Sequence, residues 1–101
     1  MAAKDLVEST ISGNQIAIFS KSWCPYCKRA KQLLTTKFPG VPTKILELDE
    51  LDEGSSMQAY LAQKTGQRTV PNIFINQKHV GGCDDVVSLD SSGKLAGLVG
   101  A

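Results

Sequence analysis

The chain has 101 residues, of which 42% are apolar, and its formal net charge is +1. This length suits one domain spanning residues 1–101, and the near-neutral charge argues against a nucleic-acid partner or a membrane surface. Three cysteines are too few for a secreted disulfide scaffold, and no apolar run approaches the ~20 residues of a membrane span. The amino-terminal residues have neither the apolar core of a signal peptide nor the arginines of a transit peptide, so we expect a cytoplasmic protein.

The first half of the chain predicts two helices with a buried strand between them. Apolar residues recur at helical spacing over residues 6–11, and Gly13-Asn14 ends this pattern. The strand Gln15–Ser20 contains an Ile-Ala-Ile-Phe run that is apolar on both faces, as a central strand requires. A second helix follows from Cys24 to about Thr36, before a segment rich in proline and glycine.

The second half of the chain alternates between strand and helix patterns and ends in two helices. The predicted elements are a strand over Thr43–Leu48, a helix through Met57 that Gly66 ends, a hairpin of Thr69–Asn76 with Lys78–Gly82, a helix capped by Asp84 or Asp85, and a last helix over Lys94–Val99. A strand–helix–strand unit followed by a helix and a hairpin implies an α/β fold, with a mixed four-stranded sheet and helices on both faces.

The motif Cys24-Pro25-Tyr26-Cys27 is the most informative stretch, because a strand pattern leads into it and a helical pattern leads out. At the start of a helix, unpaired N–H groups and the helix dipole favour a thiolate, which is the nucleophilic form of cysteine. Proline suits the first helical position, and the spacing of three places both sulfur atoms on one face of the turn. We expect Cys24 to be the exposed sulfur at the tip and Cys27 to be more shielded.

A CxxC pair can also be half of a zinc site, with His79 and Cys83 as the candidate partners. Structural zinc ligands normally come in two close pairs on loops, whereas His79 falls on a hairpin and Cys83 follows a double glycine. A CxxC pair beside a strand–helix–strand unit is typical of thioredoxin-like redox chemistry. The redox interpretation is therefore favoured over a metal site.

Charged residues cluster in two further places. Residues 47–53 hold five carboxylates, which we interpret as a solvated loop before a helix rather than as a metal site. The residues that surround the cysteines in sequence are basic: Lys21, Lys28, Arg29 and Lys31. Lys21 is best placed to face the cysteine pair, and Lys28 and Lys31 are interpreted as part of a solvated helix face.

Two segments suggest a ligand groove beside the cysteines. If Val70 precedes a cis Pro71, its backbone N–H and C=O are free to pair with an extended peptide. Gly81-Gly82-Cys83 precedes a helix N-terminus, where backbone N–H groups can bind an anion and Asp84 can accept from an ammonium group. A strand end followed by a helix cap explains the same residues, so both interpretations stay open at this point.

Three motifs together resemble the dithiol glutaredoxins of the thioredoxin superfamily, and the resemblance covers nearly the whole chain. They are Ser22-Trp23-Cys24-Pro25-Tyr26-Cys27, Arg68-Thr69-Val70-Pro71-Asn72-Ile73-Phe74-Ile75 and Gly81-Gly82-Cys83-Asp84-Asp85. The resemblance implies a thioredoxin-like fold and a glutathione-dependent thiol–disulfide oxidoreductase that reduces glutathione mixed disulfides and protein disulfides. It also implies glutathione as co-substrate, no metal, glutathionylated or disulfide-containing protein partners, and a monomer.

The resemblance assigns roles to individual residues. Cys24 is then the nucleophile and Cys27 the resolving thiol. The glutathione groove comprises Lys21, Tyr26, Gln58, Arg68, Thr69, Val70, Pro71, Gly82, Cys83 and Asp84. In this arrangement, Pro71 is cis and the tripeptide lies along Val70. Its glycine carboxylate meets the basic and amide groups, and its γ-glutamyl end meets the backbone of Cys83 and the carboxylate of Asp84.

Two other functions remain as alternatives. Some glutaredoxins share an iron–sulfur cluster between two chains through the first cysteine and glutathione, although in the family a proline after that cysteine disfavours this. A thioredoxin served by a flavoprotein reductase is the second, but thioredoxins have Gly-Pro between the cysteines and lack the Gly81–Asp85 motif. The role of Cys83 is open, either as a small residue under the ligand or as a third redox thiol.

Overall fold

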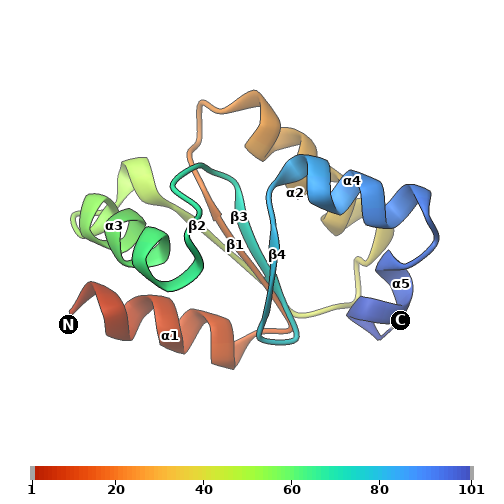
Figure 1. Ribbon diagram of the computed structural model, residues 1–101, viewed down its shortest axis with the longest axis horizontal. Helices are drawn as coiled ribbons and strands as arrows, with labels where there is room; N and C mark the ends of the chain where they lie inside the picture. The colour runs from red at the N-terminus through yellow and green to blue at the C-terminus, as the bar shows by residue number, and fades with distance from the viewer. Residues whose placement is uncertain (1, 101) are drawn as a thin grey trace.

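The computed structural model describes residues 2–100, in which strands and helices alternate along most of the chain (Figure 1). The strands are β1 (Ile16–Ser20), β2 (Thr43–Glu47), β3 (Asn72–Ile75) and β4 (Lys78–Gly81). The helices are α1 (Ala3–Gly13), α2 (Pro25–Lys37), α3 (Gly54–Thr65), α4 (Cys83–Ser91) and α5 (Leu95–Val99), and a 3₁₀ turn, η1, covers Leu48–Glu50. In the part of the chain that the structure describes, no helix has the length and apolar character needed to cross a membrane.

The strands form one mixed sheet in the order β2-β1-β3-β4, which confirms the predicted architecture. Strand β1 is parallel to β2, because helix α2 crosses over between them, and antiparallel to β3. Strands β3 and β4 form the predicted hairpin, in which Asn76 and Gln77 both have positive φ, of 49° and 68°. Every residue of β1 is buried, as its continuous apolar run predicts.

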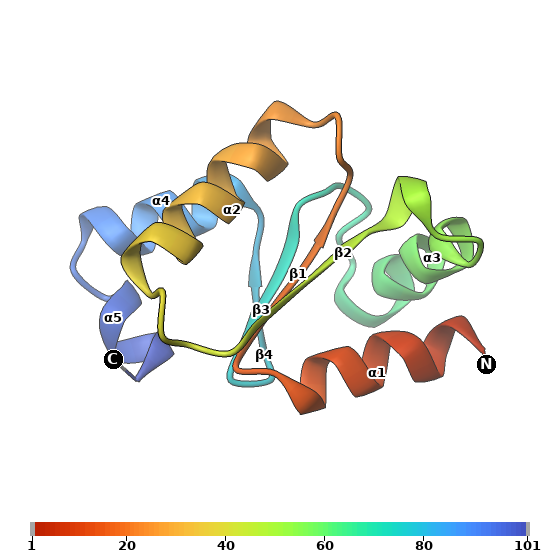
Figure 2. The same cartoon turned by 180° about the vertical axis from the view of Figure 1, so that it is seen from behind.

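Helices cover both faces of the sheet (Figures 1 and 2). Side chains alternate along a strand, so Ile16 and Ile18 of β1 face α2, α4 and α5, whereas Ala17 and Phe19 face α1 and α3. The first core layer adds Ala30, Leu34, Ile73, Ile75, Val86, Leu95 and Val99. The second layer adds Val7, Ile11, Met57, Leu61 and Phe74. The sheet is therefore held between two apolar layers, and the loops at its ends are left for function.

Strand β3 begins later than the sequence suggested, at Asn72 instead of Thr69. Pro71 has no N–H to donate to a strand ladder, so regular pairing starts one residue after it. The Val70-Pro71 peptide bond is cis, as we considered for this position. Thr69 and Val70 consequently lie outside the sheet, on an irregular segment that leads into it.

The start of α4 also differs in detail from the expectation that Asp84 or Asp85 is the cap. Gly82 is the N-cap, and its backbone N–H donates to the Asp85 carboxylate over 2.8 Å. Gly81 has a φ of 127°, and a Cβ at this position would lie 2.2 Å from the Asp85 carboxylate. The glycine pair therefore lets the chain turn into α4 while Asp85 closes over it.

Candidate active site

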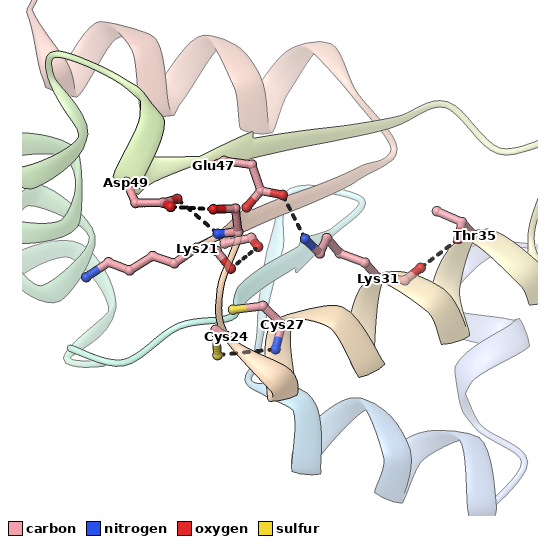
Figure 3. Close-up of polar contacts among 9 residues, drawn as sticks. Lys21, Cys24, Cys27, Lys31, Thr35, Glu47 and Asp49 are labelled. Atoms are coloured by element: carbon pink, nitrogen blue, oxygen red, sulfur yellow. Dashed lines mark hydrogen bonds and ion pairs between the residues drawn. The ribbon is translucent and has the colours of Figure 1, made fainter.

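The two cysteines of the motif lie where β1 ends and α2 begins (Figure 3). Cys24 is the N-cap of α2, Pro25 is its first helical residue, and the backbone N–H of Cys27 donates to the Cys24 sulfur over 3.4 Å. A sulfur in this position stands in for the side-chain oxygen of an ordinary cap, because it accepts from an N–H that the helix leaves unpaired. The local sequence thus aims the helix N-terminus at the Cys24 sulfur.

The burial of the pair agrees only in part with the prediction. Cys27 is fully buried, and Cys24 is 8% exposed. Cys27 is therefore the more shielded residue, as expected, but Cys24 is not an openly exposed tip. It is recessed, so only a small part of this residue is accessible to a disulfide substrate.

Burial separates the chemistry of the two thiols further. It raises the pKa of Cys27 to about 11, although hydrogen bonds with the Lys21 backbone and the Ser20 side chain act in the opposite direction. Cys27 is consequently a protonated thiol at neutral pH. All three cysteines, Cys24, Cys27 and Cys83, are free.

A groove of about 440 Å³ borders the dithiol and gathers residues from three separate parts of the chain. Its lining residues are Tyr26, Gln67, Thr69, Val70, Pro71, Gly82, Cys83, Asp84 and Asp85. Seven of these are predicted site residues, namely Tyr26, Thr69, Val70, Pro71, Gly82, Cys83 and Asp84. Residues 69–71 supply backbone that the sheet does not use, and residues 82–84 supply the start of α4.

Gln67 is a groove residue that the sequence analysis missed. Its Nε2 donates to the carbonyl oxygens of Thr69, over 3.0 Å, and Pro71, over 2.9 Å. Its Oε1 lies 3.2 Å from Nε2 of His79, which fixes the orientation of the amide. The side chain therefore spans Val70 and leaves the backbone of that residue to face the groove. No motif announces this role, since it depends on how residues 67–71 fold back on themselves.

The other three predicted ligand residues lie outside this groove. Gln58 and Arg68 line a separate hollow of about 240 Å³, where the Gln58 amide donates to the Arg68 carbonyl oxygen over 3.0 Å. The Lys21 side chain points away from the two sulfur atoms (Figure 3). Its ammonium lies 5.8 Å from the centre of the Trp23 ring, a cation–π contact.

Cys83 connects the groove to the dithiol. It is 4% exposed, and burial raises its pKa. Arg29 opposes this shift, and the nearby Asp84 and Cys24 add to it. Cys83 is thus a protonated, small side chain close to Cys24, on the wall where the groove meets the start of α4.

Lys31 and Glu47 were interpreted as solvated but form a largely buried ion pair, so that interpretation was wrong for them. Asp49 is exposed, as expected, and it also fastens the loop before the cysteines. Lys31 forms an ion pair of 2.7 Å with Glu47, and both side chains are about four-fifths buried, at 20% and 22% exposure. Asp49 accepts from the Ser22 backbone N–H over 2.9 Å and from its hydroxyl, which lowers the pKa of Asp49. Strand β2 and η1 therefore hold the residues on either side of the cysteines.

A metal site is the remaining interpretation of the cysteines to compare with the geometry. Within residues 2–100, no group of three or more His, Cys, Asp or Glu side chains is arranged to hold a metal ion. What the described residues do form is a recessed sulfur at a helix N-terminus, next to a groove with free peptide backbone and a carboxylate at one end. Such a site can bind a short peptide-like thiol or disulfide in extended form and exchange it with the sulfur.

Comparisons with known proteins agree with this geometry. The family profile described as Glutaredoxin matches residues 16–80. The chain is 51% identical to Glutaredoxin-1 of Rhizophagus irregularis over 98 residues, which cover 97% of this chain and 95% of that one. It is 51% identical over 96 residues to Glutaredoxin-C4 of Arabidopsis thaliana, which covers 95% of this chain and 70% of that one. Among solved structures, the buckwheat glutaredoxin–glutathione complex superposes with a TM-score of 0.90 at 41% identity, over 97% of this chain and 87% of that one.

Proposed function

Because this chain belongs to the glutaredoxin family and is a glutathione-dependent thiol–disulfide oxidoreductase, we propose that Cys24 is its nucleophile and Cys27 its resolving thiol. The observation that carries this assignment is the Cys24 sulfur at the N-cap of α2, beside the groove. The partial positive charge at this end of a helix stabilises a sulfur anion. Cys27 lies one turn further on, fully buried and protonated, and is suited to act only after Cys24 has reacted.

The proposed reaction with a glutathionylated protein needs one protein thiol. The Cys24 thiolate attacks the glutathione sulfur, the S–S bond to the protein breaks, and the protein leaves as a thiol. A second glutathione, as its thiolate, then attacks the Cys24–glutathione disulfide. This step regenerates the Cys24 thiolate and releases oxidised glutathione, which joins the glutathione taken from the substrate to the free glutathione that acts as the reductant.

Protein disulfides follow a second route in this proposal. Cys24 first forms a mixed disulfide with the substrate, and Cys27 then attacks the Cys24 sulfur. The substrate leaves as a dithiol and a Cys24–Cys27 disulfide remains for glutathione to reduce. Trp23, which precedes Cys24, and Tyr26, which lies between the two cysteines, are exposed at 68% and 60%, and such side chains are favoured contacts for a protein partner.

We place glutathione along the groove, with its backbone paired to Val70 in the manner of an added strand. Asp84 and the first N–H groups of α4 would meet the γ-glutamyl end, which carries an ammonium and a carboxylate. Lys21, Gln58 and Arg68 would meet the glycine carboxylate. Lys21 has to swing away from Trp23 to do so, a change that four rotatable bonds permit. The relative from buckwheat was solved with glutathione, which supports a tripeptide-sized occupant.

The proposal also covers the oligomeric state of the protein and its cellular compartment. We infer a monomer, because each step above uses residues of one chain. We infer a reducing compartment such as the cytoplasm, because three free thiols suit it.

The experiment that tests the assignment compares two substrates on the Cys27→Ser variant. We expect this variant to keep its activity on a glutathionylated protein in a glutathione-coupled assay. The same variant should lose most of its activity on a protein disulfide, because no thiol remains to release the trapped partner. If it is inactive on both substrates, the reaction needs both thiols throughout and the one-thiol route is wrong.

A further inference from the structure

The segment from Gly66 to Pro71 joins the end of α3 to the start of β3 and supplies one wall of the groove (Figure 1). The Gly66 N–H still donates to the Ala62 carbonyl oxygen of α3, over 2.8 Å. Beyond it, no hydrogen bond between backbone groups of residues 2–100 involves residues 67–71. The shape of this part of the groove therefore depends on hydrogen bonds from side chains.

Thr65, the last residue of α3, lies at the centre of these side-chain hydrogen bonds. Its hydroxyl donates to the Leu61 carbonyl oxygen over 2.8 Å, one turn back in the helix. The same hydroxyl oxygen accepts from the Gln67 backbone N–H over 3.0 Å. The Asn72 side-chain nitrogen lies 3.5 Å from it, a third and longer contact. A hydroxyl has one proton to donate and two lone pairs that accept, so Thr65 uses its full capacity.

Gln67 extends the effect of this hydroxyl to the groove. The Thr65 oxygen holds the Gln67 backbone, and the Gln67 side chain holds the carbonyl oxygens of Thr69 and Pro71, over 3.0 Å and 2.9 Å. These two carbonyl groups lie on either side of Val70 in the sequence. The Val70 backbone itself makes no hydrogen bond to the backbone of residues 2–100, so it stays available to a ligand in the groove.

Asn72 holds the other end of the segment, and its burial calls for an explanation. It is the first residue of β3 and is 1% exposed, yet its Oδ1 has no hydrogen-bond partner among residues 2–100. The Thr65 proton is donated to Leu61, so the nitrogen of the Asn72 amide has to face Thr65 and the oxygen is left over. A buried oxygen without a partner is destabilising, and an apolar side chain of similar size would avoid it. What the amide contributes in return is its contact with Thr65.

We propose that Thr65 and Asn72 are positioning residues for glutathione, although neither of them lines the groove. Their contacts hold residues 67–71 in the shape that presents the Val70 backbone before the ligand arrives. A binding edge that is already ordered spares the ligand the entropic cost of ordering it, which favours binding. The inference rests on the proposed placement of glutathione along Val70, and it adds that a hydroxyl outside the groove controls how well the tripeptide is held.

The test measures the attack of Cys24 on oxidised glutathione in a Cys27→Ser background, in which the Cys24–glutathione disulfide persists. Samples quenched with acid and analysed by mass spectrometry give the second-order rate constant, and peptide mapping identifies the modified cysteine. Thr65→Val removes the hydroxyl and keeps the size of the side chain, so we expect it to lower this rate constant about fivefold. Cystamine, a small disulfide without peptide bonds, should react at an unchanged rate, because it has no backbone to pair with Val70.

Three further variants separate positioning from a general loss of stability. Thr65→Ser keeps the hydroxyl and should react with oxidised glutathione within about twofold of the parent. Thr10→Val is the matched control, because the Thr10 hydroxyl also donates to a carbonyl oxygen four residues back, over 2.7 Å, on a helix that contributes nothing to the groove. It should change neither rate. Asn72→Leu removes the unpaired buried oxygen, so it should keep or raise the melting temperature while it lowers the glutathione rate about twofold.

Hydrogen exchange of the Val70 amide, followed by NMR in the Cys24–glutathione adduct, makes the outcomes separable from those of the proposed function. If the adduct forms on another cysteine, or the Val70 amide is unprotected in it, the proposed nucleophile or glutathione placement is wrong and this inference fails with it. If the amide is protected and Thr65→Val reacts as fast as the parent, only the positioning role is refuted. Equal slowing with oxidised glutathione and cystamine would show that the hydroxyl serves the whole fold, which also refutes it. If Thr65→Val does not fold, the same criteria apply to Asn72→Leu.

Discussion

Helix α2 follows β1 after a short loop and α4 follows β4 after Gly82, and each has a cysteine at its start: Cys24 is the N-cap of α2 and Cys83 is the first residue of α4. The first turn of α2 contains no acidic residue, so its partial positive charge is left to the Cys24 sulfur. The first turn of α4 contains Asp84 and Asp85, which complement that charge with carboxylates. The positive end of α2 is therefore left to a sulfur, whereas that of α4 is already complemented by two carboxylates, which is why we propose Cys24 rather than Cys83 as the nucleophile.

The largest expected effect comes from exchanging the two cysteines for serine. Cys24→Ser should abolish turnover of every disulfide substrate, because among residues 2–100 no other sulfur caps a helix. Cys83→Ser should retain most activity, since a hydroxyl of similar size keeps the groove wall intact. A glutathione-coupled assay on both variants measures this. If Cys24→Ser is active and Cys83→Ser is inactive, the nucleophile lies at the start of α4 and not at the start of α2.

The next largest effect is the difference between Cys24 and Cys27 in the pH dependence of their alkylation. With a pKa of about 11, Cys27 is a thiolate in about one molecule in 10⁴ at pH 7, and this fraction rises about tenfold per pH unit up to that value. We therefore expect iodoacetamide to modify Cys24 first at pH 7 and Cys27 only slowly, with a rate that climbs steadily to pH 10. Mass spectrometry of peptides from the reduced protein follows each site. Rapid modification of Cys27 at pH 7 would contradict its protonated state.

A smaller effect separates the two aspartates of α4. Asp84→Ala should raise the KM for glutathionylated substrate roughly fivefold, the equivalent of about 1 kcal/mol for a partly solvated charge contact, and leave the melting temperature unchanged. Asp85→Ala removes the carboxylate that accepts from the Gly82 N–H, so it should lower stability by about 1 kcal/mol, or roughly 5 °C. Steady-state kinetics and thermal unfolding of both variants test this division. If Asp84→Ala changes only the melting temperature, its carboxylate does not serve the ligand.

The smallest effect is expected for Gln67, which orders the groove without being proposed to touch the ligand. Gln67→Ala removes the two hydrogen bonds to the carbonyl oxygens of Thr69 and Pro71. Each bond stabilises the conformation of residues 69–71 by about 1 kcal/mol or less. The KM should therefore rise about two- to threefold, with little change in kcat. Gln63→Ala, at an exposed position of α3, is the matched control and should be neutral. Equal KM values for the two variants would mean that residues 69–71 hold their shape without Gln67.

The sequence was informative wherever a local pattern decides the structure. The Ile-Ala-Ile-Phe run could pair only as a central strand, and Pro25 fixed the start of α2 next to Cys24. Proline at 71 also made the Val70 backbone a candidate contact, which the irregular segment before β3 is consistent with. Each of these features depends on a few adjacent residues, so it can be predicted from the local sequence alone.

Contacts between distant segments were harder to predict. Glu47 and Lys31 were interpreted as solvated because each is one of several neighbouring residues with the same charge. The composition of such a stretch does not indicate which side chain is buried. A usable signal was present: Thr43, Ile45 and Glu47 alternate along β2, so the strand period puts the carboxylate on the side of Ile45, which packs in the core. Gln67 offered no such signal, since its partners are backbone carbonyls whose positions follow from the complete fold.

The position of β1 in the sheet has a consequence for biosynthesis. This strand is made early, yet its neighbours come from residues 43–47 on one side and 72–75 on the other. A growing chain on the ribosome therefore cannot pair β1 on both sides until residue 75 has emerged. Until then Cys24 and Cys27 lack the helix N-terminus and the enclosing sheet that distinguish them in the folded protein. Folding therefore creates the difference between the two thiols, since it places one at a helix N-terminus and buries the other.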